Sequence, residues 1–274
     1  MSGRRSILAV SGRAKLTLVF AVFASAVAFV WPLFAGAEAV VAGSDAAPLL
    51  FALVLPLVTA VAAAEISTGG FDAKTVAMLG VLAALGAALR PLGAGAGGIE
   101  PVFFLIVLGG RVFGPGFGFV LGSTTLAVSA LITAGVGPWL PYQMLAAAWV
   151  GLGAGLLPQA KGRVELGMLA VYGAVASFAF GLLMNLSFWP FTLGPDTSMS
   201  FVAGAPIWEN LKRFLAFEVV TSFAWEVGRA ITTAVLILVV GGTILRTLRR
   251  ASARAAFDSK PIFERTPSDA DSRL

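Results

Sequence analysis

The sequence predicts an all-α fold, a polytopic bundle of transmembrane helices, and three observations support this prediction. Of the 274 residues, 58% are hydrophobic and only 12% are charged, whereas soluble domains average about half apolar and a quarter charged. Apolar residues form eight runs, most of them near the length of about 20 residues that crosses about 30 Å of hydrocarbon. Basic residues gather at the chain ends and in short loops. We therefore expect a lipid bilayer to surround most of the chain.

The eight apolar runs are the candidate spans. They lie near residues 16–35, 47–66, 74–92, 98–112, 114–135, 141–158, 166–187 and 214–245. The fourth run is short for a span and ends at the turn formed by Gly114 and Pro115. We divide the chain into an N-terminal pair of helices (1–72), a six-helix membrane module (73–250) and a disordered polar tail (251–274).

The distribution of charge favours eight crossings with both termini in the cytoplasm. With all eight runs crossing, one side receives most of the basic residues: Arg4, Arg5, Arg13, Lys15, Lys74, Arg111, Lys161, Arg163, Arg246, Arg249, Arg250 and Arg254. Cytoplasmic loops carry such an excess. If the fourth run did not cross, the later arginines would face outward. The expected location is therefore the cytoplasmic (inner) membrane, with the first span retained because its apolar run is too long for a signal peptide.

The absence of two residue types excludes several classes of function. The chain has no cysteine and no histidine, so it lacks thiolate nucleophiles, the usual general base and the commonest metal ligand. We predict no catalytic residue, no metal site and no cofactor. The formal net charge of +5 follows from membrane topology and does not indicate a nucleic-acid partner.

The third span carries a face of small residues. Ala77, Gly80, Ala84 and Ala88 recur at spacings of three and four, and small side chains allow helix backbones to approach closely in lipid. Either another helix of this chain or a partner helix could pack there. From the residues alone we favour packing within the chain.

Polar and aromatic residues cluster at the outer ends of the last six spans, where a solute would arrive. A glycine-rich loop between Arg90 and Glu100 suits a cap over a cavity, and two later segments add aromatic and amide side chains. The substrate-binding candidates are Arg90, Glu100, Trp139, Tyr142, Gln143, Asn185 and Trp189. An aromatic belt at the membrane interface is the alternative for Trp189 and Trp208.

Two charged residues fall within the last span. Glu226 and Arg229 are three residues apart on one helical face, with Glu218 about two turns earlier. Because a charge inside a membrane is costly and usually functional, we predict an intramembrane ion pair between Glu226 and Arg229. Ligand contact, subunit docking and proton coupling are the alternatives.

Residues 73–245 resemble the S components, the substrate-binding subunits, of energy-coupling factor (ECF) vitamin transporters. The alanine-rich third span, which ends at Arg90 and Pro91, resembles the helix that docks on the coupling subunit in that family. The strings Gly110–Phe119 and Gly135–Met144 look like the predicted cobalamin-uptake subgroup. By this resemblance the docking candidates are Ala83, Ala84, Ala87 and Ala88. The extra spans within 16–66, and Leu140 and Tyr142, depart from the family pattern.

The resemblance implies a subunit that captures a vitamin, cobalamin or one of its precursors, from outside. The sequence contains no Walker A motif, so a transmembrane coupling subunit and ATPase subunits would supply the energy. Two other classes remain open. One is a membrane scaffold or assembly protein; the other is a secondary transporter, although the two halves show no evident inverted repeat.

Overall fold

The computed structural model describes residues 12–34, 36, 73–93, 97–194 and 197–257, and every regular element among them is helical. The elements are α1 (Gly12–Val30), η1 (Trp31–Phe34), α3 (Ala73–Leu89), η5 (Arg90–Gly93), α4 (Val102–Phe113), α5 (Pro115–Ile132), α6 (Leu140–Leu156), α7 (Gly162–Thr192), α8 (Ile207–Thr221) and α9 (Phe223–Phe257). The predicted all-α bundle is confirmed. The predicted span at 47–66 lies outside the described residues.

Five of the described helices are long and apolar enough to cross a membrane. They are Leu16–Phe34, Ala73–Gly93, Pro115–Ile132, Gly162–Thr192 and Phe223–Ala253. Helix α4 is shorter: its 12 residues rise about 18 Å. The chain is therefore a helical protein whose helices suit a bilayer.

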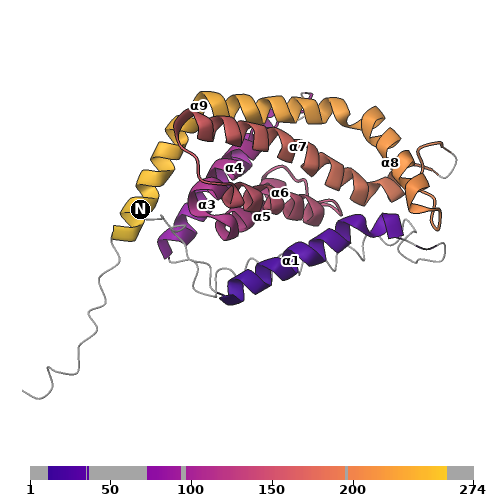
Figure 1. The fold of residues 1–274 in the computed structure, drawn as a ribbon, viewed down its shortest axis with the longest axis horizontal. Helices are drawn as coiled ribbons and strands as arrows, with labels where there is room; N and C mark the ends of the chain where they lie inside the picture. The colour runs from indigo at the N-terminus through magenta and orange to yellow at the C-terminus, as the bar shows by residue number, and fades with distance from the viewer. Residues whose placement is uncertain (1–11, 35, 37–72, 94–96, 195–196, 258–274) are drawn as a thin grey trace, which may run out of the picture.

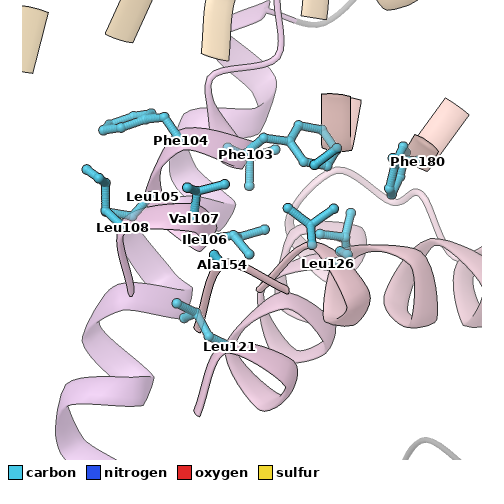
Figure 2. Packing of buried hydrophobic residues seen from close by; sticks show 14 of the residues in the cluster. Phe103, Phe104, Leu105, Ile106, Val107, Leu108, Leu121, Leu126, Ala154 and Phe180 are labelled. Atoms are coloured by element: carbon cyan, nitrogen blue, oxygen red, sulfur yellow. The ribbon is translucent and has the colours of Figure 1, made fainter. Parts of the chain in front are cut away.

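Helix α4 forms the centre of the bundle, which explains why it is apolar although it is short. Every residue of α4 except Arg111 is buried. Its side chains pack among Leu121 and Leu126 of α5, Ala154 of α6 and Phe180 of α7 (Figure 2). In Figure 1, α9 runs along one edge of the bundle beside α7, and α1 runs along the opposite edge.

Helices α4, α5 and α6 approach one another at glycines. A Cβ atom added to Gly110 or Gly118 would overlap the backbone of Gly151, and one added to Gly151 would overlap Gly118. This contact is the small-residue packing expected of membrane helices. The turn between α4 and α5 also needs a glycine, because Gly114 has a φ of 101°, and Pro115 then begins α5 with a suitable backbone angle.

The predicted last span, 214–245, is wrong in its extent. The structure divides it into α8 and α9 at Ser222, whose φ of −129° leaves the helical range, and Figure 1 shows α8 turned steeply away from α9. Helix α9 also continues to Phe257, beyond the predicted start of the polar tail at residue 251.

Two polar clusters mark opposite ends of the bundle. At the Glu165 end, Arg111 closes α4 and donates to the Leu157 carbonyl at the end of α6 (3.0 Å) and to Glu165 at the start of α7 (2.7 Å). Arg249 of α9 donates to the same carboxylate at 2.6 Å. At the Arg90 end lie Arg90 and the segment before α4. Helix α4 therefore runs between the two clusters, while its predicted crossing of the membrane stays a prediction.

Candidate functional site

Arg90 connects three helices at the Arg90 end. Its position in η5, directly after α3, directs the guanidinium toward the neighbouring helices. Nη2 donates to Oε1 of Gln143 on α6 at 3.1 Å, and Nη1 lies 3.5 Å from the Ser129 hydroxyl on α5. Two of the predicted substrate-binding residues, Arg90 and Gln143, are thus in contact.

Glu100, rather than Glu226, is the ion-pair partner of Arg229. Arg229 Nε donates to Glu100 Oε2 at 2.8 Å, and Nη1 donates to the Ser177 carbonyl at 3.1 Å. The guanidinium also lies over the rings of Phe103 and Phe180. The predicted ion pair between Glu226 and Arg229 is therefore wrong, because Arg229 is held by a carboxylate 129 residues away in sequence.

The loop that carries Glu100 is packed on α9. A Cβ atom on Gly98 would overlap the Trp225 carbonyl, and one on Gly228 would overlap the Gly97 carbonyl. Gly97 and Gly98 both have positive φ angles, which glycine adopts without strain. Trp225 Nε1 donates to Glu100 Oε1 at 3.3 Å. The described part of the expected cap is thus anchored against α9.

Asn185 connects α7 with the joint between α8 and α9. Its amide nitrogen donates to Glu218 Oε2 at 2.7 Å and to the Ser222 hydroxyl at 2.6 Å. An amide at membrane depth needs such partners, and here the partners come from within the chain. Asn185 therefore holds the joint between α8 and α9 against α7, and among the described residues it makes no hydrogen bond to Arg90 or Gln143.

Tyr142 lies beside Gln143 but faces α1 and α7. Its ring packs against Phe29 of α1 at 5.6 Å and Phe188 of α7 at 5.9 Å between centroids. Its hydroxyl is buried without a hydrogen-bond partner among the described residues. Helix α1, which the six-helix pattern does not contain, therefore covers one of the predicted binding residues.

The two predicted tryptophans do not join this cluster. Trp139 is 41% exposed and donates to the Gly135 carbonyl of its own turn. Trp189 is fully buried, donates to the Met199 carbonyl at 2.6 Å and packs on Phe214. Its burial excludes an interface-belt position for Trp189, and it anchors the segment between α7 and α8.

The small-residue face of α3 is exposed. Ala77, Gly80, Ala84 and Ala88 are all exposed, and no atom would lie within 4 Å of a Cβ added to Gly80. Within the part of the chain that the structure describes, no helix covers this face, and its packing within the chain stays a prediction. Two other docking candidates, Ala83 and Ala87, are buried and are not part of the exposed face.

Comparison with known proteins gives no assignment. No family model, curated protein or solved structure matches this chain. Within the described residues, no group of three or more acidic, histidine or cysteine side chains could hold a metal ion. The Arg90 end and the exposed face of α3 are therefore the two features that can indicate a function.

Several polar residues were missed by the sequence reasoning. Glu165, together with Arg111 and Arg249, forms an ion triad at the other end of the bundle. Ser25 of α1 accepts a hydrogen bond from Trp149 of α6 at 2.9 Å. The signal for Glu165 was present, since an acidic residue directly follows the basic segment that opens the seventh span. Its partners lie 54 and 84 residues away, and spacing alone does not reveal them.

Proposed function

We propose that this chain is the substrate-binding membrane subunit of an ECF-type importer and captures a vitamin, cobalamin or one of its precursors, from outside. The observation that carries the proposal is the architecture of α3. This helix presents an exposed face of small residues along its length, and it ends at Arg90 within the polar cluster. One helix thus joins a surface suited to a partner helix with a site suited to a solute.

The Arg90 end offers the groups that a polar vitamin needs. Arg90 supplies fixed donors, Gln143 supplies an amide, and Tyr142 supplies an aromatic ring and a buried hydroxyl without a partner. Binding sites for small molecules combine apolar walls with a few such polar groups. The excess of basic residues at the Glu165 end supports a cytoplasmic position for that end, which leaves the Arg90 end to face the solute.

Energy for uptake would come from other subunits. The sequence has no Walker A motif, so the chain lacks the loop that cradles nucleotide phosphates. A transmembrane coupling subunit would dock on the face formed by Ala77, Gly80, Ala84 and Ala88, where small side chains let backbones approach. ATPase subunits bound to that partner would then drive release of the vitamin inward.

Co-purification tests the docking face. The variant carrying Ala84→Trp and Ala88→Trp is expressed with the coupling and ATPase subunits of an ECF transporter, and recovery of the complex is measured. The matched control is Ala179→Trp, which places the same bulky side chain at an exposed position on α7. We expect loss of the complex in the α3 variant alone. Undiminished recovery would exclude this face.

Retention of a small molecule tests the site. Mass spectrometry of the protein after gentle purification should detect a bound vitamin, and Gln143→Ala should reduce its amount while the protein remains folded. Exposed Glu209 provides the control variant, Glu209→Gln. A chain that retains no solute but recovers a different protein partner would favour the scaffold function instead.

A further inference from the structure

Two buried carboxyl groups face each other at the joint between α8 and α9. Glu218 is 6% exposed and Glu226 is 3% exposed. Each has one buried oxygen, Oε1, without a hydrogen-bond partner among the described residues. Gly181, which faces the Glu226 carboxyl, and Asn185, which binds Glu218, lie one turn apart on the same face of α7, so the two carboxyls lie side by side. The transport proposal uses neither of them.

The fold makes room for this pair. A Cβ atom added to Gly181 of α7 would overlap the Glu226 carboxyl, so only glycine leaves space for that side chain against α7. On the other side, Asn185 holds Glu218 Oε2 and the Ser222 hydroxyl. The contacts with both carboxyls come from α7, while the carboxyls themselves belong to α8 and α9, so three helices meet at this pair.

Among the described residues, the guanidinium groups nearest the pair already have other partners. Arg229, one turn after Glu226, is held by Glu100 and the Ser177 carbonyl. Arg90 donates to Gln143 and Ser129. On α7, the residues that face the pair are the uncharged Gly181 and Asn185.

The sum of charges leaves one negative charge unbalanced. Among the described residues, the charged groups that act electrostatically on Arg90 and Glu226 link them into one set: the carboxyls of Glu100, Glu218 and Glu226 and the guanidinium groups of Arg90 and Arg229. Three carboxylates against two guanidinium groups give a net charge of −1. Since uncompensated charge is costly inside a membrane protein, one bound cation would restore neutrality.

We propose that Glu218 and Glu226 form a binding site for one proton, held between Oε1 of one carboxyl and Oε1 of the other. Two adjacent buried carboxylates do not both ionise readily, because like charges repel and burial disfavours each charge. A proton taken from water makes one group a carboxylic acid, which donates a hydrogen bond to the other. This single proton satisfies both unpartnered oxygens and brings the net charge of the region to zero.

Infrared spectroscopy of the full chain in lipid nanodiscs at neutral pH tests the proposal. The carbonyl stretch of a protonated carboxylic acid is separate from the carboxylate bands and shifts in D2O. We expect this band at an intensity of one group per chain. Glu218→Gln and Glu226→Gln should each abolish it, because two carboxylates then balance two guanidinium groups. The matched control, Glu209→Gln on the exposed face of α8, should leave the band unchanged.

Three outcomes would overturn the proposal. The first is a wild-type spectrum without a protonated carboxyl, a measurement that needs no variant to fold. The second is a band that persists in both glutamine variants of the pair. The third is suppression of the band by sodium chloride, but not by choline chloride, at constant pH, which would assign the site to sodium. The experiment involves no vitamin and no partner, so its result is separate from that of the transport proposal.

Discussion

Replacing the buried Glu165 should destabilise the bundle more than replacing Arg249 or Arg163, which are more exposed. Its side chain is 2% exposed and pairs with Arg111, which is 4% exposed, and with Arg249, which is 45% exposed. Glu165→Ala leaves the Arg111 charge buried with only the Leu157 carbonyl as acceptor. Breaking a buried pair from one side costs about 3–5 kcal/mol.

The cost should be much smaller at Arg249, the more exposed arginine of the triad. Arg249→Ala removes a half-exposed partner and leaves Glu165 paired with Arg111, so it should cost about 0–1 kcal/mol, as exposed ion pairs do. The matched control is Arg163→Ala, an exposed arginine at the same end, which should change stability by less than about 0.5 kcal/mol. Reversible unfolding in mixed micelles, followed by circular dichroism, gives the free energies.

A double variant separates charge from packing. Replacing Arg111 and Glu165 together by methionine removes both buried charges and keeps apolar volume, a change that is often neutral in other proteins. We expect it to cost less than Glu165→Ala alone. Equal losses for Glu165→Ala and Arg249→Ala, or a double variant less stable than the single one, would refute the reasoning.

Three further predictions concern helix contacts. Gly151→Val should cost at least about 1–3 kcal/mol by overpacking against the α5 backbone, whereas Gly80→Val, at an open position, should change the same unfolding midpoint little. Tyr142→Phe removes a hydroxyl without a partner, so the melting temperature should hold or rise while vitamin retention by mass spectrometry falls. Trp149→Phe and Ser25→Ala should each cost about 1 kcal/mol, and the double variant should cost no more than either if both act through one hydrogen bond.

The helical fold and most helix positions could be predicted from the sequence, because apolar runs of membrane length leave few alternatives. The run from residue 98 to 112 is an example: the structure forms helix α4 there, from Val102 to Phe113. The division at Ser222 could not be predicted. No glycine or proline marks it, and the Asn185 side chain that holds the Ser222 hydroxyl lies 37 residues away in sequence.

The sequence predicted which residues belong to the candidate site better than it predicted which of them contact each other. Arg90 and Gln143 were both expected to bind substrate, and they do lie together. For Arg229, sequence spacing favoured Glu226, because residues three apart share a helical face. The structure instead supplies Glu100 through a glycine turn that packs on α9. A contact of this kind depends on loop geometry, which local periodicity does not encode.

Accessibility labelling tests the central claim, that the bundle crosses the membrane with its Arg90 end outside. The chain has no cysteine, so a maleimide reacts only with a cysteine that is introduced. Single cysteines at the exposed positions Trp139 and Val164 therefore show on which side of the membrane each end of the bundle lies. In intact spheroplasts, a membrane-impermeant maleimide should label Trp139→Cys at once and Val164→Cys only after permeabilisation. Labelling of Val164→Cys from outside, with Trp139→Cys protected, would contradict the account.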